Sequence, residues 1–247
     1  GLIMIAGHNL LDPIPPQSWG AWSGLWKVLH VSAPLEPAPG YNIFVAYPLI
    51  PWIGVMATGF AFGALMKRER AERRRLMLWL GLGLIAGFVL LRATNLYGDM
   101  KPWTPQSAAL FTMFSFVNCT KYPPSLLYLM MTLGPALVFL SFSDRELGGA
   151  WTKPIIVFGR VPLFFYLLHL PLIHGIAVLL SFLHYGNANG ILHSPVFPES
   201  EGLPADYGYG LLVVYAIWAL VIVLLYPLCR WFADLKQRRR DPWLSYF

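Results

Sequence analysis

The sequence predicts an all-α fold, a polytopic bundle of transmembrane helices. Only 12% of its 247 residues are charged, against about 25% in an average soluble domain, and 57% are hydrophobic. Long segments without a charged side chain, such as 76–91 and 211–228, alternate with short basic clusters. Cations gathered at the ends of apolar segments are typical of the cytoplasmic ends of membrane-spanning helices.

Five segments are apolar over roughly 20 residues, the length that a helix needs to cross a bilayer. They are residues 42–66, 76–94, 123–142, 155–182 and 210–229. Residues 1–11 are also apolar but too short, and no basic segment precedes them as in a signal peptide. We therefore expect five full spans plus a partial N-terminal span, in a single membrane domain (1–247) that is the C-terminal portion of a longer protein.

Basic residues set the expected orientation, because most of the 18 Lys and Arg residues fall in two clusters. The clustered residues are Lys67, Arg68, Arg70, Arg73, Arg74, Arg75, Arg230, Lys236, Arg238, Arg239 and Arg240. Since Lys and Arg accumulate in cytoplasmic loops, we expect both clusters and the C-terminus on the cytoplasmic side. The connections 12–41, 95–121 and 183–209 then lie outside.

The outer connections predict short helices that lie in the membrane interface. Trp19, Trp22 and Trp26 stand in one proline-flanked segment, and tryptophan favours the interface. A second interfacial helix is expected near residues 106–117, whereas 183–209 shows no regular pattern.

Glycines and prolines predict how the spans pack and where they break. The pairs Gly59–Gly63 and Gly83–Gly87 favour close packing inside the bundle, with a homodimer or other membrane subunits as the alternative. Prolines lack the N–H group that a helix interior uses. Breaks are therefore predicted at Pro48, Pro51, Pro135 and Pro171.

The composition also argues against several kinds of partner. The net charge of +6 comes from cations that flank apolar segments, so we expect contact with the lipid bilayer and no nucleic acid. Cys119 and Cys229 have neither a CxxC spacing nor a histidine partner, and we expect no metal site.

The fourth predicted span carries the catalytic candidates, because an ionisable side chain inside a span is costly. Counted from Ile155 at about 1.5 Å per residue, His169 lies past the middle of a hydrocarbon core of about 30 Å. Tyr166 is three residues earlier on the same face. The alternative is that His169 is a buried structural histidine, and His174 is expected to matter less. Arg160 is interpreted as an anchor near the cytoplasmic end.

A second polar group is expected at the outer mouth of the bundle, where RATNLYGD (92–99) ends one span and NCTKYPPS (118–125) begins the next. The binding candidates in these segments are Arg92, Asn95, Asp99, Asn118, Lys121 and Tyr122. The cations among them would bind a phosphate or a carboxylate.

Five longer segments resemble bacterial membrane proteins of the heparan-α-glucosaminide N-acetyltransferase type. They are HNLLDPI (8–14), YPLIPWIGVMATGFAFG (47–63), LRATNLYGD (91–99), FVNCTKYPPSLLYLMMTLGP (116–135) and GRVPLFFYLLHLPLIH (159–174). The resemblance implies an acyltransferase of the bacterial inner (plasma) membrane. Such an enzyme moves an acetyl or other acyl group from acetyl-CoA or another acyl-CoA to a sugar or other acceptor at the outer face.

The resemblance leaves the catalytic residue open. The family's key histidine belongs to N-terminal helices that this chain lacks, and no residue here matches it. His8, in HNLLDPI, joins the binding candidates. Two other functions remain as alternatives: a non-catalytic membrane subunit of a larger complex and, third, a transporter. A transporter of the inverted-repeat kind would show a repeat, and none is visible in the sequence.

The predicted orientation can be tested with Arg70→Cys, Gly190→Cys and Arg238→Cys, each in a background without Cys119 and Cys229. A thiol reagent that does not cross membranes should label Gly190→Cys from outside and the other two only from the cytoplasmic side. Labelling of Gly190→Cys from the cytoplasmic side would contradict the topology.

Overall fold

The structure is a computed structural model that describes most of the chain. It leaves out residues 39–40, 145–148, 150–151, 193–206, 240, 242–243 and 245–247. The chain divides into two compact units, Gly1–Glu146 and Leu147–Phe247, and each is described by itself. Parts of the predicted outer connection 183–209 and of the second basic cluster lie outside the described residues.

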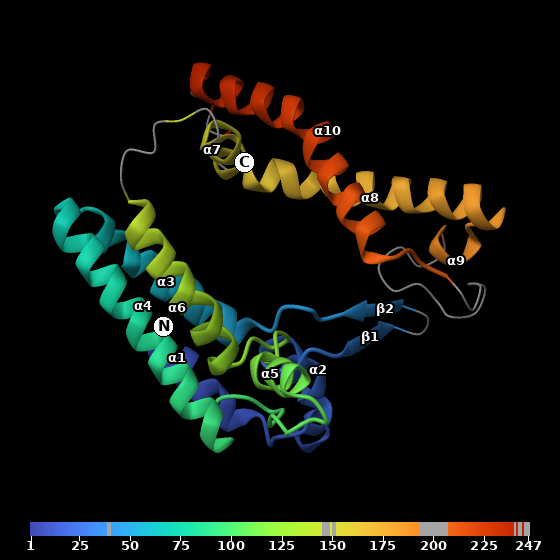
Figure 1. The fold of residues 1–247 in the computed structure, drawn as a ribbon. Helices are drawn as coiled ribbons and strands as arrows, with labels where there is room; N and C mark the ends of the chain where they lie inside the picture. The colour runs from blue at the N-terminus through green and yellow to red at the C-terminus, as the bar shows by residue number, and fades with distance from the viewer. Residues whose placement is uncertain are drawn as a thin grey trace. The chain divides into compact units, whose positions relative to one another are not determined.

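The described residues are mostly helical and confirm the predicted fold class. Five of their helices are long and apolar enough to cross a membrane (Figure 1). These helices are α3 (Leu49–Met66), α4 (Arg70–Thr94), α6 (Leu126–Ser143), α8 (Pro162–Tyr185) and α10 (Leu211–Arg238). A shorter apolar segment, formed by α1 (Leu2–Gly7) and η1 (His8–Leu11), precedes them.

Short helices occupy the connections where we expected them. The tryptophan-rich segment forms η2 (Pro16–Trp22) and α2 (Ser23–Leu29), and the second connection forms α5 (Ala109–Val117). A two-stranded antiparallel hairpin, β1 (Pro34–Ala38) and β2 (Tyr41–Phe44), was not predicted. Residues that precede proline favour extended backbone, which suits the proline-rich β1.

The first long helix starts later than predicted, because residues 42–44 belong to the hairpin. Pro48 is the N-cap of α3, and Pro51 stands in its first turn. The first N–H groups of a helix have no partner within it, so a proline there removes nothing. The breaks predicted at Pro48 and Pro51 are therefore wrong, and these prolines instead mark where α3 begins.

Helices α4 and α6 run antiparallel and pack through glycines (Figure 1). A Cβ atom at Gly81 would lie 2.8 Å from the carbonyl oxygen of Gly134, and one at Gly87 would lie 2.5 Å from Met130 Cε. In the described part of the chain, a Cβ at Gly83 would meet no heavy atom within 4 Å. Of the predicted pair Gly83–Gly87, only Gly87 takes part in the close contact, together with Gly81. For the pair Gly59–Gly63 of α3, a Cβ at either position would meet no heavy atom of the described residues within 4 Å.

The predicted fourth span is two helices, α7 (Thr152–Arg160) and α8, with a break at Val161 (φ −134°, ψ 49°). Pro162 is the first residue of α8, and a residue before proline is disfavoured in the α conformation. The depth of His169 counted from Ile155 is therefore wrong. Counted from Pro162, His169 lies about 10 Å along α8. The helix itself continues through Pro171.

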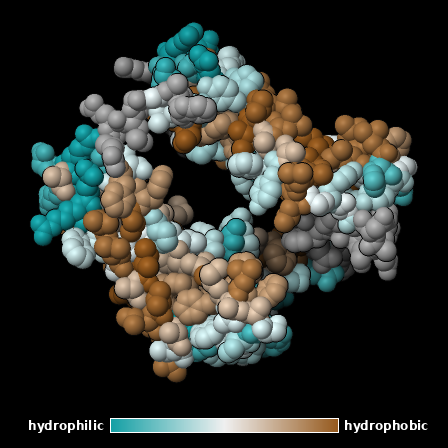
Figure 2. Space-filling view, in the orientation of Figure 1, coloured by the Kyte–Doolittle hydropathy of each residue, from teal (hydrophilic) through white to brown (hydrophobic). Residues whose placement is uncertain are grey.

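The second unit packs α7, α8 and α10 around a small apolar core. Val161, Leu225 and Cys229 are buried there, and the Phe164 ring stacks on Phe232 at 4.2 Å between centroids. The short helix α9 (Asn189–Leu192) follows α8. Figure 2 shows apolar surface along α4 and α10, with hydrophilic surface at the α3–α4 turn and at the end of α10. Such exposed apolar surface is what helices that face lipid require.

The α4–α6 contact predicts that Gly81→Ala destabilises the protein while Gly83→Ala does not. The new methyl group at Gly81 would meet backbone of α6, and overpacking of this kind costs about 1–3 kcal/mol. Thermal unfolding in detergent would measure the difference. Equal midpoints for the two variants would contradict the packing.

Candidate functional site

The predicted binding residues gather at one end of the first unit, where α4 ends and α6 begins. Because α4 and α6 run antiparallel, the end of α4 lies beside the start of α6. The basic residues 67–75 lie at the opposite end, where α4 begins. The structure places there Arg92, Asn95, Asp99, Asn118, Lys121, Tyr122 and His8. The catalytic candidates His169 and Tyr166 belong to the second unit.

Arg92 is buried, with 1% of its surface exposed, and within the described residues its guanidinium donates to backbone carbonyls. The acceptors are Phe116 O at 2.9 Å, Lys101 O at 2.7 Å, Ser115 O at 3.2 Å and Asn118 O at 3.0 Å. Four such bonds fold the segment between α4 and α6 around one cation. The geometry makes Arg92 a clamp, and its predicted binding of a substrate anion stays a prediction.

Asp99 and Asn95 tie the same segment together. The Asp99 carboxylate accepts hydrogen bonds from Thr120 N at 2.7 Å, Ser125 Oγ at 2.7 Å and Lys101 N at 2.8 Å. Asn95 ends α4 in the left-handed conformation (φ 53°), and its amide binds the backbone of Trp103. Asp99 also lines the pocket described below.

Lys121 and Tyr122 are exposed side chains that interact with each other. The ammonium lies 5.1 Å from the centre of the Tyr122 ring. A hydrogen bond with Lys121 lowers the pKa of Tyr122, and the same contact raises the pKa of Lys121. Burial raises the pKa of the neighbouring Cys119 thiol to about 11, so this thiol stays protonated at neutral pH. A protonated thiol is a weaker nucleophile than a thiolate.

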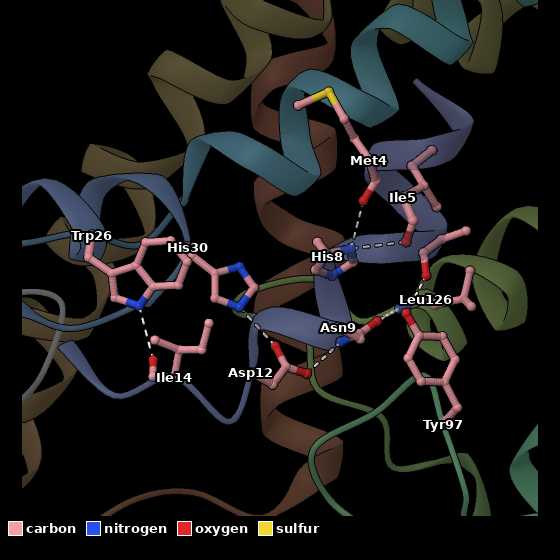
Figure 3. A network of polar contacts seen from close by, with 11 residues as sticks. Met4, Ile5, His8, Asn9, Asp12, Ile14, Trp26, His30, Tyr97 and Leu126 are labelled. Atoms are coloured by element: carbon pink, nitrogen blue, oxygen red, sulfur yellow. Dashed lines mark hydrogen bonds and ion pairs between the residues drawn. The ribbon is translucent and has the colours of Figure 1, made fainter. Parts of the chain in front are cut away.

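His8 is buried and has one ring nitrogen without a partner (Figure 3). Its Nδ1 lies 2.9 Å from Ile5 O and 3.1 Å from Met4 O, so Nδ1 carries the proton and donates. The unprotonated Nε2 has no hydrogen-bond partner among the described residues. Asn9 follows directly and accepts from Leu126 N at 2.9 Å, which joins η1 to the start of α6.

Asp12 and His30 form the second part of this network. Asp12 accepts from Asn9 Nδ2 at 2.8 Å through Oδ2 and from His30 Nε2 at 3.0 Å through Oδ1. In the neutral form of the ring, the carboxylate holds the proton on Nε2, and Nδ1 is then the unprotonated nitrogen. This nitrogen is also buried and has no partner among the described residues. The His8 and His30 rings are edge to face, with centroids 6.0 Å apart. We call His8, Asn9, Asp12 and His30 the histidine network.

The rings and the backbone around His30 hold it in place. The Trp26 ring lies 5.2 Å from the His30 ring, and Trp26 Nε1 donates to Ile14 O at 3.0 Å. Trp19 stacks on Trp26 at 4.7 Å. The tryptophans predicted to lie in the interface thus also pack the histidine network. The prediction of an interfacial position did not include the contact between Trp26 and His30.

A pocket of about 360 Å³ opens beside the histidine network. Its lining consists of Asn9, Asp12, Pro13, Leu96, Tyr97, Gly98, Asp99 and Met100. The Tyr97 hydroxyl donates to Ala6 O, and burial raises the pKa of Tyr97. A ligand in this pocket would therefore meet two carboxylates, one of which holds His30.

In the second unit, His169 binds its own helix. Its Nδ1 donates to Tyr166 O at 2.7 Å, and its ring stacks on Phe165 at 5.2 Å between centroids. Tyr166 is 50% exposed and its ring lies 5.3 Å from that of His169. The two side chains do lie together, as their spacing predicted. Their catalytic role stays a prediction.

Sequence analysis missed Asp12 and His30. They are 18 residues apart in a connection that was interpreted only as interfacial, and no periodic pattern links them. The available signal was the position of Asp12, four residues after the candidate His8 in the same HNLLDPI motif. In the part of the chain that the structure describes, no group of three His, Cys, Asp or Glu residues is placed to hold a metal ion.

Comparisons with known proteins give no further guide to this site. No protein-family model, no curated protein and no solved structure matches the chain. The functional argument therefore uses the geometry of the histidine network and the resemblance described above.

The clamp predicts that Arg92→Met lowers the free energy of unfolding by about 3 kcal/mol or more, because buried carbonyls lose bonds to a charged donor. Lys101→Met is the control, since only the backbone of Lys101 takes part in the clamp. The midpoint of thermal unfolding in detergent measures both. A shift as small as that of the control would contradict the clamp.

Proposed function

We propose that this multi-pass membrane protein takes part in acyl transfer, from an acyl-CoA to a hydroxyl or amine of a sugar or other acceptor. The observation that carries the proposal is the Asp12–His30 pair beside a pocket. Acyl transfer needs a base for the acceptor proton, and an imidazole held by a carboxylate is a common one. The family resemblance supports the same reaction class.

The acceptor would bind in the pocket next to Asp12. The Asp12–His30 pair would take the proton of the attacking hydroxyl or amine; Asp12 is the member of the pair that lines the pocket, and His30 binds Asp12 from behind. The acceptor atom then bonds to the thioester carbonyl carbon as the carbon–sulfur bond breaks. The CoA sulfur leaves as the thiolate and is protonated. Asp12 stabilises the imidazolium, as the carboxylate does in other histidine–carboxylate pairs that act as a general base.

The histidine network is fixed before any ligand binds. Asn9 holds Asp12 through Oδ2 and is itself held by the first N–H group of α6. A base that is already oriented avoids the cost of ordering it during the reaction. His8 adds a buried nitrogen without a described partner close to the His30 ring.

The proposal predicts that Asp12→Asn and His30→Gln each lower acyl transfer about 100-fold or more, which is the usual contribution of a general base. Release of CoA from acetyl-CoA, measured with amino-sugar acceptors in liposomes, is the assay. Unfolding midpoints near that of the parent protein would show that the variants are folded.

The control variant is His174→Ala, which replaces a histidine of the second unit. His169→Ala tests the site that the sequence predicted. Loss of activity in His169→Ala with full activity in His30→Gln would move the site to α8. Full activity in all of these variants would contradict both sites.

A further inference from the structure

The basic end of the first unit carries a pocket that the proposed acyl transfer does not use. It lies where the start of α4 meets the end of α6 and has a volume of about 300 Å³. Its lining consists of Ala71, Arg74, Arg75, Leu78, Ser141 and Phe142. Two arginines and two large apolar side chains therefore share one pocket.

Other arginines of this end are already paired. Arg73 makes two hydrogen bonds of 2.7 Å to the Asp144 carboxylate, and Arg70 Nε donates to Asp144 O at 2.9 Å. The contact with Arg73 lowers the pKa of Asp144, which therefore stays ionised. Arg68 pairs with Glu72. The nearby acids Asp144 and Glu72 are thus engaged by arginines outside the pocket.

Arg74 is held through a backbone carbonyl, and its charge also helps to lower the pKa of Asp144, the carboxylate that Arg73 binds. Arg74 Nε donates to Ser141 O at 2.9 Å, which fixes the side chain and leaves its terminal nitrogens for another acceptor. Within the described residues, no acid forms an ion pair with Arg74 or Arg75. Two guanidinium groups at one pocket favour an anion with several oxygen atoms, because each group donates two hydrogen bonds in one plane.

The apolar half of the pocket narrows the choice of anion. Leu78 lies one turn further into the apolar part of α4 than Arg74, and Phe142 is 52% exposed. Inorganic phosphate would gain no binding free energy from these apolar side chains. A phospholipid would, because its acyl chains lie close to its phosphate. Basic pockets between spans are known to bind anionic headgroups in this way.

We propose that this pocket binds the phosphate headgroup of an anionic phospholipid. Arg74 and Arg75 contact the phosphate, and the lipid chain runs along Leu78 and Phe142. The Ser141 carbonyl orients Arg74 for this contact. The pocket thereby joins α4 and α6 at the end opposite the histidine network.

Native mass spectrometry of the detergent-purified protein tests the proposal with phosphatidylglycerol and phosphatidylcholine of the same chain length. The parent protein should retain phosphatidylglycerol in preference to phosphatidylcholine. Arg75→Gln should weaken that retention about tenfold, the loss expected for one charged hydrogen-bond donor. Since Arg75 makes no hydrogen bond to the described residues that would hold the fold, the variant should keep the parent unfolding midpoint.

Lys67→Gln is the matched control, because it removes one exposed positive charge of the same cluster outside the pocket. Equal losses in Arg75→Gln and Lys67→Gln would mean diffuse charge attraction and would overturn the proposal. Equal retention of the two lipids by the parent protein would also overturn it. Displacement of phosphatidylglycerol by added CoA in the parent but not in Arg75→Gln would assign the pocket to the acyl donor instead.

Discussion

The buried Arg92 guanidinium is the interaction on which the rest of the first unit depends. Its four bonds to backbone carbonyls fold the segment between α4 and α6. That fold places the Asp99 carboxylate against Ser125, the N-cap of α6, and Leu126 then donates its N–H to Asn9. Asn9 holds Asp12, and Asp12 holds His30. One chain of polar contacts therefore runs from the end of α4 to the histidine network.

The spans were predictable because hydrocarbon imposes a simple demand. Every backbone polar group at that depth has to be satisfied within its own helix, so a long apolar segment without charge predicts a helix. Segment ends were less predictable because they depend on single residues. Pro162 splits the predicted fourth span, although its effect on Val161 was available from the sequence. The β1–β2 hairpin depends on pairing between strands, and neither strand has a pattern strong enough to predict it.

The candidate site was predictable in part, and for a physical reason. Polar residues at the ends of two neighbouring spans meet when the spans pack, so Arg92 and Asp99 could be grouped before the structure was known. The pairing of Asp12 with His30 could not be predicted in this way. The Asp12–His30 contact closes a loop of irregular backbone, and such contacts follow from tertiary packing rather than from spacing. Sequence analysis assigned Arg92 to a ligand and did not predict the carbonyls that its guanidinium binds.

Buried nitrogens without a described partner distinguish the histidine network from His169 and support its proposed role as a base. A buried polar atom without a partner costs about 1–3 kcal/mol, and replacing it by an apolar group of the same shape removes that cost. Among the described residues, three buried side-chain nitrogens lack a partner, and His8 Nε2 and His30 Nδ1 are two of them. An unprotonated nitrogen is useful where a proton has to be accepted, and here it lies beside a carboxylate that also lines a pocket.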